Sequence, residues 1–417
     1  MGLKVVGSGL SFVLNVILAR LLGVNGLGIY SYVLAWNQLL AVPALLGLDN
    51  LLVREIAIYK AQSSWGLIRG ILRWSNLIVA ISSFSIASIA IAFTWYSGIK
   101  ARPEMLIAFS LAMVLLPISA LRNIRLSTMR AFQRVLMGLI PEMLFVPVII
   151  ITLTGCSYFF IDSDLTASWI LGIRLIATII TLAIGMWLLQ RVLPPPVKQA
   201  ACEYQIRAWS SKLLPFMLLG GMYVATSRSD VLMLGAIRGT DAAGLYDPVT
   251  RGVELLAFVF IAANNVLSSS IASLYAENKL KEMQRIVTQS SRIMLLISLP
   301  IAAFLLLGGN WYLSLFGFEF LQARSALAIL CLGQLFSLAV GSVDTLLTMT
   351  GHENYSLMGS VVNVMLNVIL NWFWIPLWGI NGAAAATASS IVVVSILKLV
   401  WVRNKIGVNS TALGRFK

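Results

Sequence analysis

The stretch Leu22-Gly23-Val24-Asn25-Gly26-Leu27-Gly28-Ile29-Tyr30 is a glycine-rich hairpin between two long apolar runs. A related hairpin recurs about half a chain later as Leu234-Gly235-Ala236-Ile237-Arg238-Gly239-Thr240-Asp241-Ala242-Ala243-Gly244-Leu245-Tyr246. Two shorter pairs recur at a similar offset: Thr128-Met129 and Met137-Gly138 correspond to Thr348-Met349 and Met358-Gly359. The nearly constant offset predicts that the halves are duplicated six-helix units. A duplicated membrane bundle is typical of transporters whose halves rock about a central cavity.

The composition indicates a membrane protein. Hydrophobic residues make up 59% of the 417 residues and charged residues only 11%. A soluble domain of this length would need far more charge to cover its surface. The apolar runs last about 20 residues, as in membrane helices, whereas strands of a membrane barrel would alternate over about 10. We therefore expect an all-α integral membrane protein.

The apolar stretches predict twelve transmembrane helices, six in each half. Their approximate bounds are 2–22, 28–50, 70–97, 104–127, 135–159, 165–190, 211–236, 243–274, 286–308, 322–348, 355–376 and 380–402. Because six is an even number, both halves enter the membrane from the same side, so the repeat is parallel. The expected domains are an N-terminal bundle (1–190), a cytoplasmic linker (191–212), a C-terminal bundle (213–403) and a cytoplasmic tail (404–417).

Basic residues predict the orientation of the bundle. Most of the 30 lysines and arginines follow the even-numbered spans or lie near the two ends of the chain. The opposite loops hold few charges: Lys100, Arg102, Arg238, Asp162 and Asp164. The positive-inside rule therefore places both termini in the cytoplasm, with the protein in the inner (plasma) membrane. The net charge of +14 reflects this rule and contact with anionic membrane lipids, and no nucleic acid partner is expected.

The linker begins with Pro194-Pro195-Pro196, a triplet that favours an extended and semi-rigid spacer. Part of 200–212 has the pattern of an amphipathic helix lying on the membrane. In that arrangement Trp209 would occupy the interface.

The sequence carries no catalytic or metal-binding signature. Cys156, Cys202 and Cys331 lack metal-ligand spacing, and His352 is the single histidine. We expect no enzyme activity, no metal and no cofactor. No cleavable signal peptide is expected either, because the first apolar segment leads straight into the hairpin.

Several motifs resemble a known family. The run from Leu18-Ala19-Arg20 to Ser31-Tyr32, the run from Asp230 to Tyr246, and Trp378-Gly379-Ile380-Asn381-Gly382-Ala383-Ala384-Ala385-Ala386-Thr387 occur in order along nearly the whole chain. They resemble Wzx-type O-antigen and polysaccharide flippases, which are related to MATE drug antiporters and lipid II flippases. The resemblance implies a MATE-like fold with a central cavity. It also implies transfer of an undecaprenyl-pyrophosphate-linked oligosaccharide from the cytoplasmic to the outer leaflet, with a polysaccharide polymerase as a candidate partner.

Intramembrane arginines are the candidate pyrophosphate ligands, because a guanidinium binds phosphate with two nitrogens and stays protonated. The candidates are Arg20, Arg54, Arg228 and Arg251, with Arg122 and Arg174 as weaker ones. Under the repeat offset, Arg20, Arg54 and Arg251 correspond to Leu232, Ser270 and Ala35, so their charge is not required by the repeated architecture. The resemblance supports Arg20 and Arg54.

Structural roles remain open for each arginine. Arg20 can snorkel to the interface, Arg54 lies in a basic loop, and Asp247 and Glu254 can neutralise Arg251 from the same helix face. Arg228 and Asp230 are two apart on a helix and so point in different directions.

Other polar residues in the spans are candidates for sugar contact or ion coupling. Sugar contact is expected from Trp36, Asn37, Gln38, Asn264 and Asn265. Coupling to Na⁺ or H⁺ is expected from Glu142, Asp230, Glu254 and Asp344. Pairing between helices is the structural alternative for both sets. Asn363, Asn367 and Asn371 form a polar stripe that should face a cavity or a neighbouring helix.

Three alternative functions remain to be weighed. A MATE-type cation antiporter would need a cavity dominated by carboxylates, which the arginine-rich candidate set disfavours. A lipid II flippase would share the flippase mechanism but carry an extra helix pair. A polymerase or ligase would need a large outer loop for its catalytic groups, and the predicted outer loops are short.

Overall fold

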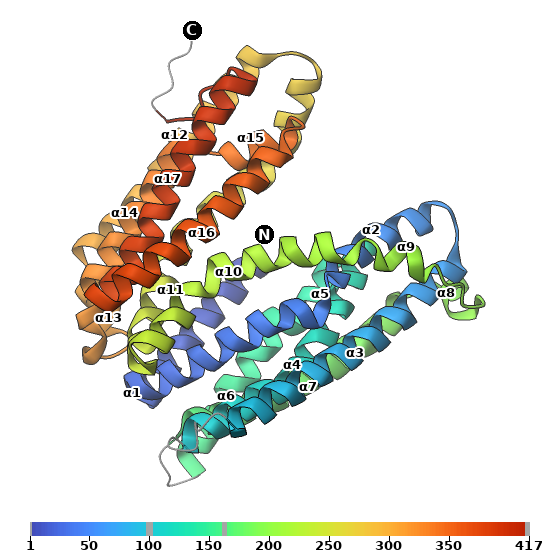
Figure 1. Ribbon diagram of the computed structural model, residues 1–417, viewed down its shortest axis with the longest axis horizontal. Coiled ribbons are helices and arrows are strands. Elements are labelled where there is room, and N and C mark those ends of the chain that lie inside the picture. The colour runs from blue at the N-terminus through green and yellow to red at the C-terminus, as the bar shows by residue number, and fades with distance from the viewer. Residues whose placement is uncertain (1, 97–102, 161–164, 413–417) are drawn as a thin grey trace. The chain divides into compact units, whose positions relative to one another are not determined.

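The computed structural model describes residues 2–96, 103–160 and 165–412. Lys100, Arg102, Asp162 and Asp164, which helped to predict the outer side, lie outside the described residues. In the part that is described, every regular element is a helix (Figure 1). The expected all-α class is therefore confirmed. The chain divides into unit 1, Met1–Ala225, and unit 2, Thr226–Lys417.

Unit 1 contains the first ten helical segments and the start of α10. Its elements are α1 (Gly2–Leu45), α2 (Leu48–Ala61), α3 (Trp65–Tyr96), α4 (Pro103–Ala131), α5 (Val135–Ile140), the π-helical turn η2 (Pro141–Phe145), α6 (Val146–Phe160), α7 (Ala167–Val192), α8 (Pro195–Gln199), α9 (Ile206–Ser210) and α10 (Leu213–Ile237). Helix α4 packs between α3, α7, α1 and α2.

Unit 2 contains the end of α10 and the remaining helices. They are α11 (Thr240–Ala276), α12 (Leu280–Leu307), α13 (Gly309–Ser314), the 3₁₀ helix η3 (Phe318–Ala323), α14 (Arg324–Val340), α15 (Val343–Met349), α16 (Glu353–Trp378) and α17 (Ile380–Ile406). Helix α17 packs against α16 and α14.

Both copies of the glycine-rich hairpin contain a glycine in the left-handed region. Gly23 has φ 64° and ψ −170° and interrupts α1, so α1 consists of two helices joined at a kink. Gly239 has φ 94° and ψ 168° at the start of α11. Side chains disfavour these backbone conformations, and glycine adopts them without a steric penalty. The repeated hairpin is therefore a repeated break between helices.

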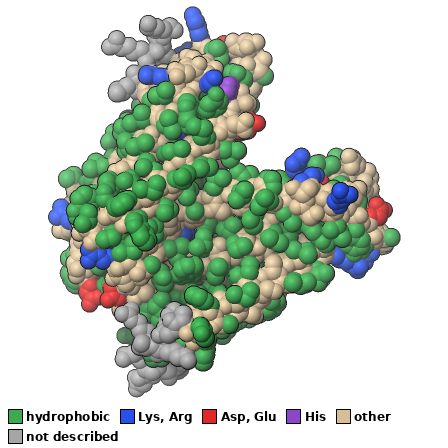
Figure 2. Space-filling model, in the orientation of Figure 1, with side chains coloured by type: hydrophobic (Ala, Val, Ile, Leu, Met, Phe, Trp, Pro, Cys, Tyr) green, Lys and Arg blue, Asp and Glu red, His purple; other side chains and the backbone are tan. Residues whose placement is uncertain are grey.

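Ten helices of the described structure are long and apolar enough to cross a membrane. One of them is counted from Val5 to Leu45, across the Gly23 kink, and α10 is not among the ten. The protein is thus a multi-pass membrane protein. Its surface agrees, because Leu77, Ile81 and Phe84 lie on one face of α3 and are each more than half exposed. Figure 2 shows hydrophobic side chains along the helices and charged side chains mainly near their ends.

The segment 191–212 packs within unit 1, against α2 and α3. Trp209 has no exposed surface, packs against Trp74 at a centroid distance of 5.4 Å, and donates from Nε1 to the Tyr59 hydroxyl at 2.9 Å. Lys212 forms an ion pair with Glu55 at 2.8 Å. The indole of Trp209 is therefore buried in the protein, where α2 and α3 offer it an apolar contact and a hydrogen-bond acceptor in one place.

Candidate functional site

Unit 1 contains a basic cluster formed by Arg122 and Arg125 of α4, Glu142 of η2, and Arg174 of α7. Arg125 is buried and the other three residues are half-buried. Arg122 Nη1 lies 3.0 Å from Glu142 Oε2, and Arg125 Nη2 lies 2.7 Å from Glu142 Oε1. The two arginines are three residues apart and share one face of α4. Arg174 acts electrostatically on Arg122 and donates from Nη1 to the Tyr30 hydroxyl at 2.6 Å. Two arginines thus pair with a single carboxylate, and a third arginine lies close enough to act on Arg122.

Local sequence explains how Glu142 reaches α4. Pro141 has no amide hydrogen, so the regular helical bonding pattern cannot continue through it. Pro141–Phe145 instead forms a wider π-helical turn. Such turns redirect side chains and recur at functional sites.

Arg125 has hydrogen-bonding capacity left over. Its side chain is fully buried, yet Nε and Nη1 have no hydrogen-bond partner among the described residues. Leaving a buried donor unpaired is costly. Gly185 of α7 makes room for this side chain, because a Cβ at that position would collide with the Arg125 guanidinium. The cluster therefore holds more positive charge and more donors than Glu142 satisfies.

Unit 2 contains a buried polar network around Asp230 of α10. Asp230 Oδ1 accepts from Asn371 Nδ2 at 2.7 Å and from Asn367 Nδ2 at 3.2 Å, and Oδ2 accepts from the hydroxyls of Tyr246 and Thr387. The partners come from α11, α16 and α17. The stripe of Asn363, Asn367 and Asn371 is expected to face a cavity or a neighbouring helix, and these bonds show that Asn367 and Asn371 face neighbouring helices.

The Asp230 carboxylate has no cationic partner among the described residues, since its contacts there are all neutral groups. The Asn371 Oδ1 atom is buried without a partner in the same part of the chain. Burying a carboxylate without a cationic partner is costly, and the four hydrogen bonds offset part of that cost, so the site favours binding of a proton or a cation. The oxygens gathered here are hard donors, which suit a small cation.

The arginines singled out from the sequence lie in different surroundings. Arg20 and Arg54 are exposed, and Arg228 is half-buried. Arg251 Nε lies 3.6 Å from Asp247, and its Nη1 lies 3.3 Å from Glu254, so the expected neutralising pairs are present. The arginines brought together in one cluster are instead Arg122 and Arg174, two weaker candidates, and Arg125.

The carboxylates predicted for ion coupling separate into two kinds. Glu142 is paired with two arginines, Glu254 with Arg251, and Asp344 with Lys398 at 2.6 Å. Only Asp230, among these candidates, is held by neutral donors. Within the described residues, no group of three or more histidines, cysteines, aspartates or glutamates is arranged to hold a metal.

The predicted sugar contacts also differ in exposure. Asn37 is buried and donates to the Ala112 carbonyl of α4, whereas Trp36 and Gln38 are half-buried. In unit 2, Asn265 is exposed, and Asn264 has a buried Oδ1 atom without a partner among the described residues. Asn37 therefore serves helix packing.

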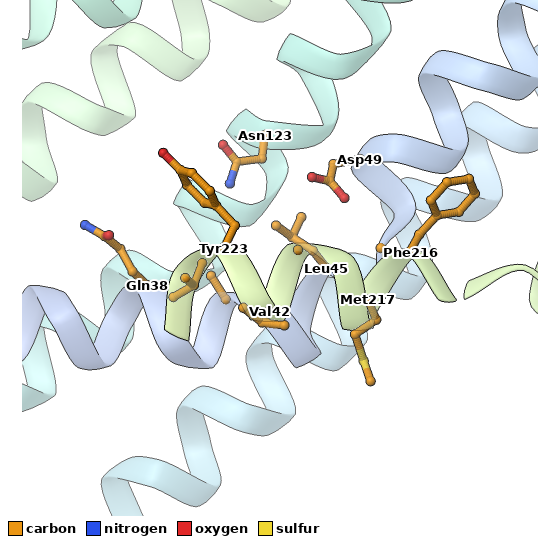
Figure 3. Close-up of a pocket in the computed structure, with 12 residues that line it drawn as sticks. Gln38, Val42, Leu45, Asp49, Asn123, Phe216, Met217 and Tyr223 are labelled. Atoms are coloured by element: carbon orange, nitrogen blue, oxygen red, sulfur yellow. The ribbon is translucent and has the colours of Figure 1, made fainter. Parts of the chain in front are cut away.

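Gln38 borders a cavity of about 230 Å³ within unit 1. The polar lining comes from Asp49 of α2, Asn123 of α4 and Tyr223 of α10 (Figure 3). Helix α2 is not among the candidate membrane spans. Burial raises the pKa of the Asp49 carboxyl, and backbone hydrogen bonds and the charge of Arg130 offset part of this shift.

Comparison with known sequences assigns the family. The family described as "polysaccharide biosynthesis protein" matches residues 1–267, more than half of the chain, and the MatE family matches residues 215–373. This chain belongs to the polysaccharide biosynthesis protein family. The resemblance inferred from the hairpin motifs is thereby confirmed.

Two archaeal relatives match this family member over most of its length. The probable low-salt glycan biosynthesis flippase Agl15 of Haloferax volcanii is 23% identical over 406 residues, covering 94% of this chain and 80% of that protein. An uncharacterised membrane protein of Methanocaldococcus jannaschii is 23% identical over 420 residues, covering 95% and 81%.

Solved structures establish a MATE-like fold for this family member. An inward-facing multidrug resistance MATE transporter of the MOP superfamily aligns with a TM-score of 0.76 at 13% identity, covering 97% of this chain and 94% of that one. A Pyrococcus furiosus MOP superfamily transporter, whose binding pocket is described as having reverse polarity, aligns with a TM-score of 0.66 at 14% identity and the same coverage.

Proposed function

We propose that this protein is a flippase that moves an undecaprenyl-pyrophosphate-linked oligosaccharide from the cytoplasmic to the outer leaflet by alternating access. The observation that carries the proposal is the basic cluster of Arg122, Arg125 and Arg174 against the single carboxylate of Glu142. Arginine donors bind phosphate oxygens with favourable geometry and charge. A cationic drug would be repelled by the same cluster, which disfavours the MATE-type antiporter.

Helix lengths support twelve spans in two six-helix units. A helix of 41 residues is about 60 Å long at 1.5 Å per residue, roughly twice the thickness of a hydrocarbon core. The run from Val5 to Leu45 has this length, and its break at Gly23 divides it into two spans. Helix α10, with 25 residues, is long enough for one more. We place both termini in the cytoplasm because of the basic residues in the expected inner loops.

The flippase proposal is tested in proteoliposomes that contain the purified chain and a fluorescent undecaprenyl-pyrophosphate-linked disaccharide. Accessibility of the glycan to an added lectin measures transfer between leaflets. We expect the Arg122→Gln and Arg125→Gln variants to slow transfer by about tenfold or more, because each removes a charged donor. Arg134→Gln is the control, because Arg134 is an exposed residue at the start of α5.

Two results would contradict the proposal. One is transfer at the wild-type rate in both cluster variants. The other is uptake of tetraphenylphosphonium by the wild-type chain without any glycan transfer, which would favour the antiporter.

Arg20 and Arg251 remain candidate pyrophosphate ligands in the proposed cavity. Replacing either with alanine should reduce glycan export without loss of membrane insertion. The measurement is export in cells together with the amount of chain in the membrane fraction. Undiminished export by both variants would remove these residues from the mechanism.

We infer that Asp230 couples transport to Na⁺ or H⁺. Its carboxylate is buried among the side chains of Asn367, Asn371, Tyr246 and Thr387, and it lacks a cationic partner among the described residues. Rotation of the Asn371 amide would add its unpartnered Oδ1 atom to the oxygens around a cation. Exchange of a bound cation between the two sides would supply a driving force.

Thermal unfolding of the purified chain distinguishes the two ions. Ligand binding to the folded state raises the unfolding temperature with concentration. Na⁺ coupling predicts a rise with NaCl that KCl does not reproduce, and Asp230→Asn should abolish it. Asp344→Asn is the control, because Asp344 already pairs with Lys398. No Na⁺ effect and no pH dependence of transport would contradict coupling through Asp230.

A further inference from the structure

The cavity beside Gln38 has no basic residue among the described residues that line it, so it is not part of the proposed pyrophosphate site. It lies at the junction of the end of α1, the start of α2, the second half of α4 and the first half of α10, all in unit 1. Its volume of about 230 Å³ is below the roughly 300–1,000 Å³ of sites for drug-sized ligands. The space therefore suits a small group, such as one ring of a larger molecule.

The polar groups of the cavity are available for a ligand. Asn123 and Tyr223 have no hydrogen-bond partner in the part of the chain that the structure describes, and the Tyr223 side chain is 77% exposed. Figure 3 shows the polar ends of Tyr223, Asn123 and Asp49 on one side of α10, whereas Met217 points to the other. Val42, Leu45 and Phe216 supply the apolar part of the lining.

We propose that this cavity binds one neutral sugar ring of the glycan head, an inference that rests on the proposed flippase function. A carboxylate accepts hydrogen bonds from sugar hydroxyls, a carboxamide both donates and accepts, and a phenol ring covers the apolar face of a pyranose. Asp49, Asn123 and Tyr223 provide one group of each kind.

The charge of the cavity selects among sugars. Asp49 is the single charged residue of the lining, and its carboxylate would repel the carboxylate of a uronic acid. Like charges brought together in a partly buried site cost free energy, because solvent screens them weakly. The cavity therefore favours a neutral hexose or an N-acetylhexosamine over an acidic sugar.

Helix α4 connects this cavity to the basic cluster. Arg122 of the cluster and Asn123 of the cavity are consecutive residues. Consecutive helical residues differ by about 1.5 Å along the axis and by about 100° around it. Phosphate-binding and sugar-binding groups thus lie at one level of α4 on adjoining faces. This arrangement matches a head group in which the first sugar is bonded directly to the pyrophosphate.

The test measures binding of small probes to the purified full chain in nanodiscs by saturation-transfer NMR. The probes are methyl N-acetyl-β-glucosaminide, methyl glucoside, methyl glucuronide, tetraphenylphosphonium and inorganic pyrophosphate. At least one neutral glycoside should bind the wild-type chain. The Asn123→Ala and Asp49→Asn variants should weaken it about tenfold, as expected for the loss of one buried hydrogen bond. The glucuronide should bind about tenfold more weakly than the neutral sugar.

Matched control variants separate binding from folding. Asn50→Ala removes an exposed amide next to Asp49, and Asp241→Asn neutralises an exposed aspartate that, like Asp49, lies in the first turn of its helix. Both controls should keep the wild-type affinity for the glycoside. Tyr223→Phe retains the ring and tests the hydroxyl alone. Each variant must also keep the wild-type unfolding temperature and its affinity for pyrophosphate.

The outcomes distinguish this inference from the flippase proposal. Neutral glycoside binding that is absent, or is insensitive to both Asn123→Ala and Asp49→Asn, overturns the sugar site. So does tetraphenylphosphonium binding that depends on Asp49. The flippase proposal survives either result if the wild-type chain binds pyrophosphate and Arg122→Gln weakens that binding. If the wild-type chain does not bind pyrophosphate, the proposed function itself is contradicted.

Discussion

Arg125 is the residue whose environment departs furthest from an ordinary buried side chain. It carries a full charge in a site without exposed surface, and one carboxylate oxygen and one distant carbonyl are its partners. Burying such a charged group in a membrane protein costs free energy, and residues of this kind usually have a function. The neighbouring helix contributes by leaving space, because Gly185 has no side chain where the guanidinium lies.

A substitution at Gly185 tests this arrangement. Gly185→Ala should destabilise the protein by about 1–3 kcal/mol, because the added methyl group collides with the Arg125 guanidinium and displaces it from Glu142. Gly155→Ala is the control, because a Cβ at Gly155 meets no atom within 4 Å. The measurement is the thermal unfolding midpoint in detergent. Equal midpoints for both variants would show that Arg125 has room to move.

Among the helices, α1 is distinguished by the kink at Gly23 that divides it into two parts. Its two parts are both strongly apolar, and the conformation of Gly23 separates them. Gly23→Ala should cost about 1–3 kcal/mol, since non-glycine residues rarely adopt this region of backbone space. Gly9→Ala, in the first part of α1 and without close neighbours, should be neutral or slightly stabilising. Unfolding midpoints of the two variants provide the comparison.

The segment 191–212 is a second element with a clear anchor. Trp209→Ala should cost about 3 kcal/mol, because it empties a buried aromatic site and removes the donor to Tyr59. We also expect faster trypsin cleavage at Arg207 and Lys212 in the folded protein. Trp95→Ala is the control, because Trp95 is 54% exposed. Unchanged cleavage would mean that the ion pair of Lys212 with Glu55 holds the segment without Trp209.

For the whole molecule, the distribution of basic residues makes an orientation prediction. In a variant whose native cysteines are replaced by serine, Ser210→Cys should lie in the cytoplasm and Asp241→Cys outside. Both native residues are exposed. A membrane-impermeant maleimide should label position 241 in intact cells, and position 210 only after the membrane is opened. Labelling of position 210 in intact cells would reverse the predicted topology.

Most of the helices could be predicted from composition alone. Long apolar runs, glycine hairpins and basic loops gave most helix positions within several residues, because a membrane helix must satisfy its backbone internally and span a fixed thickness. The predicted spans missed α2 as a separate helix and the break at Gly341 between α14 and α15. Candidate residues were harder to identify. Arg122, Arg125 and Arg134 all fall in one basic stretch near the end of a predicted span. Nothing in the sequence distinguishes the buried guanidinium of Arg125 from the exposed side chains of Arg130 and Arg134.

The sequence by itself determined that the chain is a multi-pass helical membrane protein of the polysaccharide biosynthesis family. Hydropathy and repeated small-residue motifs are local properties, so they can be recognised in short stretches of the sequence without knowing how the helices pack. The tertiary structure decided which charges meet. Glu142 reaches Arg122 and Arg125 across a π-helical turn, and Asp230 gathers neutral donors from three other helices. Such pairings depend on packing between distant helices, and local sequence patterns do not record which faces come together.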